Sequence, residues 1–295
     1  MSTKPAKTRR SRSLRSVPPL AREVVLDIHD IQGNIFVGFN KDQQLLIALR
    51  LRDIAAARYW LGRILPYVNS VAEVGQFNKL FHARRLRLSG ADPDGLTATW
   101  ANIAFSHNGL ARLTSKTEAD GVPDESFRVG MPDQAAALGD RAPLGQIEVT
   151  KNWKVGGKGN IPDVLLIIAS DDEVQLEQLA ELMRPTVGDT SAPEVVWEEM
   201  GRTRRDLPGH EHFGFKDGIS HPAVRGLTDV HLNSYLSERL LEAAQVGDVE
   251  FASPGNPLVW PGQFVFGYPS TNGSSDNGGE PVEPPELNPK WLKNG

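Results

Sequence analysis

The sequence predicts an α+β fold in which helices cover one face of an antiparallel sheet. The first observation is the order of its apolar patterns over residues 43–204, which alternate between strand and helix and end on a strand. The second is that the segments between strands differ greatly in length, unlike the regular crossovers of a parallel, doubly wound sheet. The third is the absence of an internal repeat of solenoid length. Together they favour a ferredoxin-like layer.

The first elements lie between residues 33 and 113. Residues 33–53 predict one or two strands, and 43–51 is rich in Leu and Ile, as a buried strand is. Residues 97–106 alternate as a strand does, and 106–113 begin a short helix. Between them, a helix is predicted by apolar residues at three- and four-residue spacing, with Pro66 ending or kinking it. Its apolar stripe consists of Ala57, Trp60, Leu61, Ile64, Leu65 and Val68.

The middle of the chain is irregular until residue 163. Residues 114–159 are rich in Gly, Pro and Asp, and we expect a long excursion with little regular structure, a kind of segment that is usually functional. Residues 163–170 predict a buried strand. Ser170 and Glu173 have the spacing of a capping box, which predicts the start of a helix that Pro185 ends. Its inner face would consist of Leu176, Leu179, Ala180 and Met183, and residues 194–204 predict a last strand.

The ends of the chain differ from its body. Residues 1–20 carry six basic residues and no acid, and we expect a disordered basic tail. A first domain is predicted at 21–208. After it, residues 233–245 predict a helix, 264–268 a strand, and 271–295 a loop rich in Gly, Pro, Ser and Asn. Because the chain ends on that loop, we expect 209–295 to be the start of an incomplete second ferredoxin-like domain.

Composition excludes several classes of protein. The chain has no cysteine, so disulfides, thiolate nucleophiles and iron–sulfur clusters are impossible. It has no apolar run long enough to span a membrane, and its net charge of -5 argues against a nucleic-acid partner. The tail lacks the apolar part of a secretory signal, and Arg9-Arg10 alone does not make a twin-arginine signal, so we expect a cytoplasmic protein.

The stretch "GHEHFGFKDGIS" (residues 209–220) gathers ionisable and aromatic residues among glycines. Asp217 followed by Gly218 is typical of a turn. A zinc-binding hydrolase that uses His210, His212, Asp217 and His221 is an alternative, since imidazole and carboxylate ligands suit zinc. Its spacing departs from the His-x-His-x-Asp-His pattern, in which the aspartate comes two residues after the second histidine.

Four motifs, in order, resemble the dye-decolorizing peroxidase family. They are "DIQGNI" (30–35), "NIAFSHNGLARL" (102–113), "GHEHFGFKDGISHP" (209–222) and "WPGQFVFGYP" (260–269). The Gly-x-x-Asp-Gly signature of the family falls on Gly214, Asp217 and Gly218. The resemblance implies two ferredoxin-like domains of the dimeric α+β barrel type with haem b between them. It further implies a peroxidase that reduces hydrogen peroxide and oxidises dyes or phenolic compounds by one-electron steps, and an oligomer is possible.

The resemblance also implies roles for individual residues. Asp217 would lie on the distal face of the haem and move the proton that peroxide must lose and regain. Gly214, Phe215, Gly218, Ile219 and Ser220 would contact the haem, with the glycines letting the backbone come close. The proximal histidine and distal arginine of the family lie further downstream and have no counterpart here. We therefore expect residues 1–295 to be a truncated chain with little or no peroxidase activity, or a non-catalytic fragment.

Overall fold

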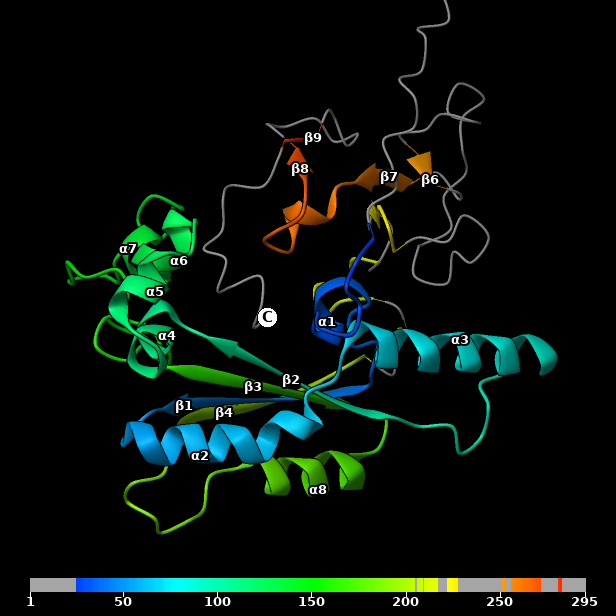
Figure 1. Cartoon of the computed structure of the whole chain (residues 1–295), viewed down its shortest axis with the longest axis horizontal. Coiled ribbons are helices and arrows are strands. Elements are labelled where there is room, and N and C mark those ends of the chain that lie inside the picture. Colours follow the sequence, from blue (N-terminus) through cyan, green and yellow to red (C-terminus); the bar gives the residue numbers. More distant parts are fainter. Residues whose placement is uncertain are drawn as a thin grey trace, which may run out of the picture.

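The computed structural model describes residues 25–204, 206–208, 210–216, 222–227, 251–252, 256–271 and 281–282. Its body is a four-stranded sheet in which every pair of neighbours is antiparallel, in the order β2-β3-β1-β4 (Figure 1). The strands are β1 (Gln43–Arg50), β2 (Thr99–Phe105), β3 (Val164–Ser170) and β4 (Glu194–Arg202). This order is that of a ferredoxin-like domain and confirms the predicted fold class.

The main core lies between the sheet and two helices, α2 (Ile54–Ile64) and α8 (Glu173–Met183), which cover the same face (Figure 1). Alternate residues of β1 and β3 point into it, as the two-residue period of a strand requires. The indole Nε1 of Trp60 on α2 donates to the carbonyl of Met183 at 2.8 Å and links the two helices. Pro66 lies in a 3-10 turn, η1 (Leu65–Tyr67), that ends α2 as predicted.

The start of α8 differs from the prediction. Asp172 is the N-cap, and its side chain accepts from the N–H of Gln175 at 2.9 Å. The predicted capping box of Ser170 and Glu173 is therefore wrong, because β3 runs on through Ser170. The hydroxyl of Ser170 instead pairs with that of Thr99 on β2, at 2.7 Å, and accepts from the N–H of Asp172.

A helix that the sequence did not predict, α3 (Val71–Arg87), lies on the opposite side of the sheet from α2 and α8 (Figure 1). The expectation of helices on one face only is therefore wrong. Ser70 and Glu73 form the capping box of α3, and only its first turn is buried.

Next to α3, the first predicted strand region begins as a short helix, α1 (Gly33–Phe36). Gly33 fits against α3, where a Cβ would lie 2.5 Å from Cγ2 of Val74. The N–H of Asn34 donates to the side chain of Asn102 at 2.9 Å, so α1 is held by contacts distant in sequence.

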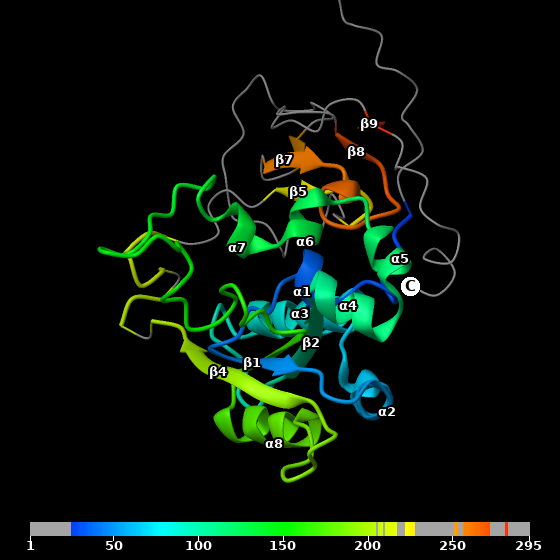
Figure 2. The same cartoon turned by 90° about the vertical axis from the view of Figure 1, so that its left-hand side faces the viewer.

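The stretch predicted to be irregular contains short helices. After α4 (His107–Leu113), which was predicted, come α5 (Lys116–Asp120), α6 (Glu125–Val129) and α7 (Met131–Gln134). Ser115 and Asp124 cap α5 and α6 with their side chains, a local signal that the analysis of apolar periodicity did not use. These helices lie on the opposite side of the sheet from α8 (Figure 2).

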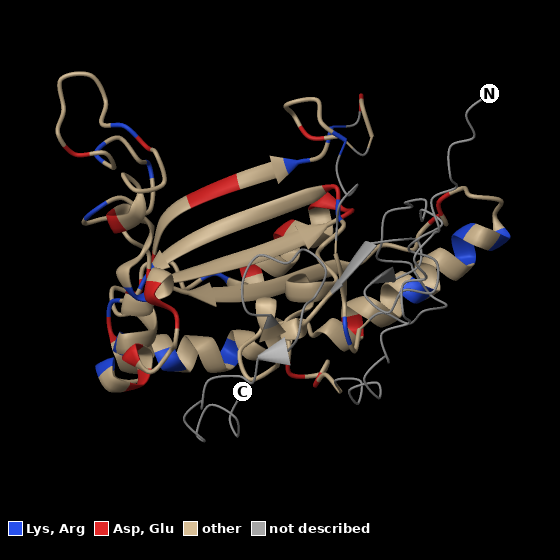
Figure 3. Ribbon diagram, turned by 90° about the horizontal axis from the view of Figure 1, so that it is seen from above, with Lys and Arg blue, Asp and Glu red and all other residues tan. Residues whose placement is uncertain are grey.

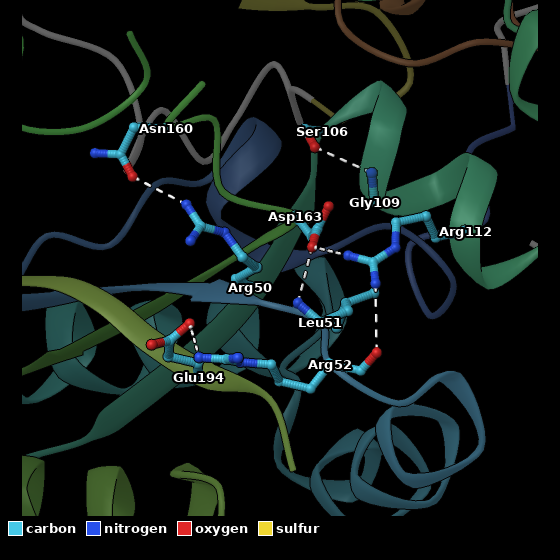
Figure 4. Close-up of polar contacts among 9 residues, drawn as sticks. All are labelled: Arg50, Leu51, Arg52, Ser106, Gly109, Arg112, Asn160, Asp163 and Glu194. Carbon is cyan, nitrogen blue, oxygen red and sulfur yellow. Dashed lines mark hydrogen bonds and ion pairs between the residues drawn. The ribbon is translucent and has the colours of Figure 1, made fainter. Parts of the chain in front are cut away.

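A buried carboxylate fixes the junction of α4, β1 and β3 (Figure 4). Asp163 is 5% exposed and accepts from the N–H of Leu51 at 2.8 Å and from Nη1 of Arg112 at 2.6 Å. Gly109 of α4 lies directly on the backbone of Asp163, where a Cβ would come within 2.7 Å of the carbonyl carbon. A glycine is thus required by close approach of the helix to the chain entering β3.

The described residues after 222 form small sheets that pack on the start of the first region. β5 (Ala223–Val224), β7 (Asn256–Val259) and β6 (Phe251–Ala252) form one, and β8 (Ser270–Thr271) pairs with β9 (Pro281–Val282). The hydroxyl of Tyr268 accepts from the N–H of Asp27 at 3.0 Å.

The predicted strand at 264–268 is wrong. A 3-10 helix, η2 (Pro261–Gln263), is followed by turns, because the chain folds back so tightly that a Cβ at Gly262 would lie 2.6 Å from the carbonyl oxygen of Pro269. The predicted tail (1–20) and helix (233–245) lie outside the described residues, and the domain boundary at 208/209 stays a prediction.

Candidate functional site

The end of β4 is clamped to the start of β1. The N–H of Thr203 donates to the carbonyl of Asp42 at 2.9 Å, and its hydroxyl donates to Oδ1 of Asp42 at 3.1 Å. These bonds fix the direction in which the chain leaves the sheet. We call residues 206–208 and 210–216, which follow, the signature loop.

An ion pair holds the beginning of the signature loop. Arg204 donates from Nε and Nη2 to the two carboxylate oxygens of Asp206. This bond is the main reason that the pKa of Asp206 is below its ordinary value of 3.8, and the nearby His212 lowers it further. The same pair raises the pKa of Arg204. Asp206 therefore remains a carboxylate at neutral pH.

The signature loop makes a tight turn. His210 and Lys216 form an antiparallel bridge, and the N–H of Glu211 donates to the carbonyl of Phe215 at 2.8 Å. Gly214 donates to the carbonyl of Glu211 at 2.9 Å and has a φ of 90°, a conformation that favours glycine. A Cβ at Gly214 would meet nothing within 4 Å, so the position favours glycine because of its backbone conformation and not because of close packing.

Two phenylalanines flank that glycine and point outward. Phe213 is 87% exposed and Phe215 is 71% exposed. Exposed aromatic side chains on a hydrogen-bonded turn offer apolar surface to a ligand or to another part of a protein.

A cavity of about 780 Å³ lies between the signature loop and the sheet. Its walls come from the start of β1, the end of β4 and the loop itself, and include Lys41, Arg202, Arg204, His210, Glu211 and Phe213. Lys41 is anchored in its wall by an ion pair with Asp171 and by the ring of Phe77, 4.6 Å away. The cavity is polar on the sheet side and apolar at Phe213.

The structure places part of the predicted site. Gly214 and Phe215 lie on the turn, whereas Asp217, Gly218, Ile219, Ser220 and His221 lie outside the described residues, so the roles of these five stay predictions. His210 contacts the carbonyl of Pro208 through Nδ1 at 3.1 Å. Over the described stretches of the chain, no group of three or more His, Asp and Glu residues could hold a metal ion.

The sequence analysis did not predict the two interactions that position the signature loop, which are the hydrogen bonds of Thr203 to Asp42 and the ion pair of Arg204 with Asp206. The bond between Thr203 and Asp42 joins residues far apart in the chain, and no pattern marks it. The pair of Arg204 and Asp206 did have a local signal, because opposite charges two residues apart in a turn often meet.

Comparison with known proteins decides the family. Residues 30–204 match the family model described as the DyP dimeric alpha+beta barrel domain. This chain belongs to the dye-decolorizing peroxidase family. The match covers the sheet and all of its helices and ends where the signature loop begins.

Several dye-decolorizing peroxidases are similar over most of this chain. That of Mycena epipterygia is 29% identical over 272 residues, which cover 92% of this chain and 40% of that protein. That of Exidia glandulosa is 32% identical over 215 residues, 71% of this chain and 37% of that protein. The chain therefore spans less than half the length of these relatives.

Solved structures agree. An ancestral D-type dye-decolorizing peroxidase is 29% identical, with a TM-score of 0.57 over 69% of this chain and 41% of that one. A variant of a dye-decolorizing peroxidase in complex with cyanide is 25% identical, with a TM-score of 0.55 over 88% of this chain and 47% of that one. Among the described helices, none has the length and apolar character needed to cross a membrane.

Proposed function

We propose that this protein is a haem-dependent peroxidase that reduces hydrogen peroxide and oxidises dyes or phenolic compounds by one-electron steps. Family membership and the names of the relatives support this function. The cyanide complex of one relative supports a metal centre, since cyanide is a ligand of ferric iron. The observation in this chain that carries the proposal is the signature loop, whose exposed Phe213 and Phe215 lead directly to Asp217.

The signature loop suits haem b as a partner. Phe213 and Phe215 supply exposed apolar surface, and the space beside Gly214, where a Cβ would meet nothing within 4 Å, leaves the backbone open to a flat ring. When bound, haem would supply the redox-active iron through which electrons pass from the aromatic substrate to peroxide. Gly218, Ile219 and Ser220 would extend the contact surface.

Asp217 would manage the protons of the reaction. As a carboxylate it can accept a proton from one oxygen of hydrogen peroxide and return it to the other oxygen, which leaves as water. Two further protons and two electrons, one from each of two substrate molecules, complete the reduction to two waters. The bridge between His210 and Lys216 would fix the base of the turn next to Asp217.

A hemin titration of residues 1–295, followed by the Soret band, tests the binding part. We expect Phe215→Ala to weaken hemin binding, because it removes apolar surface at the ring. Phe266→Ala is the matched control, since Phe266 is also exposed, at 53%, but lies on another turn. Equal hemin affinity of the Phe215→Ala variant and the unaltered protein would contradict the proposed contact.

The peroxide reaction tests the role of Asp217. The reaction of the hemin complex with hydrogen peroxide can be followed through the change in the Soret band. We expect Asp217→Asn to bind hemin normally and to react with peroxide about 10²–10⁴-fold more slowly, the usual contribution of a general acid–base group. Asp140→Asn, at an exposed position, is the control. Zinc at unit stoichiometry in the purified protein would instead favour the hydrolase alternative.

A further inference from the structure

The outer part of α3 projects from the protein. Only the first turn of the helix, Val71–Gly75, is buried, and the helix runs on beyond the sheet (Figure 1). Residues 82–92 are all exposed. We call residues 79–88 the α3 arm. A helix that leaves the body of a domain without being covered is a candidate interaction surface.

The α3 arm is both apolar and basic. Leu80 and Leu88 are each 50% exposed. They share one face with Arg84 and Arg87, because the four positions have the i, i+4, i+7, i+8 spacing of a helix. The sequence has no acidic residue between Glu73 and Asp92. Figure 3 shows the resulting row of basic residues on the arm.

Arg84 and Arg87 are available for another molecule. Within the described part of the chain, neither has an ion pair, whereas Arg85 bonds the carbonyl of Gly90 and pairs with Asp92. A partner that covers these basic side chains and the leucines beside them would need a surface that is both acidic and apolar.

A second surface of this chain has those properties. The outer face of α8 forms a shallow groove, the α8 groove, in which Val174 is 66% exposed and Leu182 is 53% exposed. α8 contains no Lys or Arg. Arg184, just after it, pairs with Glu177, Glu181 and Glu198, and Arg202 pairs with Glu173, so two cations face four carboxylates. The residues of the groove are Glu173, Val174, Glu177, Gln178, Glu181 and Leu182.

The two surfaces match in length as well as in charge. The exposed apolar residues at their ends are eight positions apart in both surfaces: Leu80 and the C-cap Leu88 on the arm, and Val174 and Leu182 in the groove. At ~1.5 Å per residue this is about 12 Å in both. The α3 arm and α8 lie on opposite sides of the sheet (Figure 1), so the arm of a chain faces away from its own groove.

We propose that the α3 arm of one copy of this chain docks in the α8 groove of a second copy. The two helices would run antiparallel, with Leu80 on Leu182 and Leu88 on Val174. Arg84 and Arg87 would then approach the glutamates of the groove, Glu177 and Glu181. Because two different surfaces meet, a pair of copies leaves one arm and one groove open, and further copies can add to form rings or open chains. A contact of two helical turns on each side is small, so association should depend on concentration. The proposal is independent of haem and of peroxidase activity.

The lack of cysteine in this chain allows a direct test. One chain carries Leu80→Cys and another carries Leu182→Cys, and the two are mixed and oxidised. We expect disulfides that join a Leu80→Cys chain to a Leu182→Cys chain to be several-fold more abundant than disulfides that join two copies of the same variant. A mixture of Leu144→Cys with Leu182→Cys is the control, because Leu144 is fully exposed outside both surfaces.

Charge reversal tests the pairing without altering the core. Adding Arg84→Glu and Arg87→Glu to the Leu80→Cys chain should reduce its cross-linking to the control level, and high salt should do the same. In sedimentation, the mass of the unaltered protein should rise with concentration above that of one chain, and the reversed variant should remain a monomer.

Other outcomes would overturn the proposal. Cross-linking of Leu80→Cys with Leu182→Cys no greater than the control, or a single-chain mass at every concentration, excludes this contact. If the unaltered protein then binds phosphatidylserine vesicles and the reversed variant does not, the arm is a membrane-surface helix instead.

Discussion

Replacing Gly109 by alanine should destabilise the protein, although alanine is the better helix former. In an open helix this change stabilises by up to ~1 kcal/mol. At Gly109, however, the added Cβ would come within 2.9 Å of the carbonyl carbon and Cα of Asp163, both backbone atoms. That backbone cannot move freely, because the side chain of Asp163 is held by Arg112 and by the N–H of Leu51. Overpacking of this kind costs about 1–3 kcal/mol, and after the gain in helix propensity is subtracted we expect a net loss of about 1 kcal/mol.

Gly62 provides the matched control. It also lies inside a helix, α2, but a Cβ there would meet nothing within 4 Å. Gly62→Ala should therefore raise the free energy of unfolding by about 0.5–1 kcal/mol. Urea denaturation followed by circular dichroism measures both variants. In heating experiments the Gly109→Ala variant should melt about 2–4 °C lower. A Gly109→Ala variant as stable as the unaltered protein would refute the reasoning that close approach selects this glycine.

Three further predictions concern the core, a cap and the signature loop. Leu166→Ala should lower the free energy of unfolding by about 2–5 kcal/mol, because Leu166 is 0% exposed, whereas Leu144→Ala should leave it unchanged in the same urea titration. Ser70→Ala should lower the free energy of unfolding by about 1 kcal/mol, because α3 loses its N-cap. An unchanged unfolding curve, followed by circular dichroism, would contradict a stabilising role of this cap. The pKa of Asp206 is lowered, so its bond to Arg204 is complete above pH 3.8 and is lost as pH falls through the lowered value. Carboxylate NMR should give a pKa under 3.8, and a higher one would contradict the ion pair.

The sheet and the helices of its core could be predicted from the sequence because their residues alternate or recur with strong periodicity. The helix α3 could not, since only Val71, Ala72, Val74 and Gly75 are buried and its remaining apolar residues are half-buried or exposed. Its one local signal was the capping spacing of Ser70 and Glu73. At the start of α8, capping spacing led to a wrong prediction. Ser170 and Asp172 both have capping spacing, and only the extent of β3 decides between them.

The candidate site shows the same limit. The glycine at position 214 was predictable from the motif, and the structure gives its physical reason as a positive φ. The outward direction of Phe213 and Phe215 could not be read from the sequence, because it depends on the bridge of His210 with Lys216. The clamp of Thr203 on Asp42 depends on strand pairing and becomes visible only in three dimensions.

The position of β1 in the middle of the sheet has a consequence for how the protein is made. Both neighbours of β1 are encoded much later: the N–H of Leu51 bonds Asp163 across 112 residues, and Thr203 bonds Asp42 across 161 residues. At ~5–20 residues per second, a ribosome needs roughly 10–30 s to deliver the second partner. Until β3 has been made, about 6–24 s after β1, the apolar strand "QQLLIALR" has neither edge paired, and until β4 has been made one edge stays unpaired. The topology of the sheet thus makes folding slow. The yield of native protein in cells should depend on whether chaperones or other parts of the chain cover β1 until its partner strands have been made.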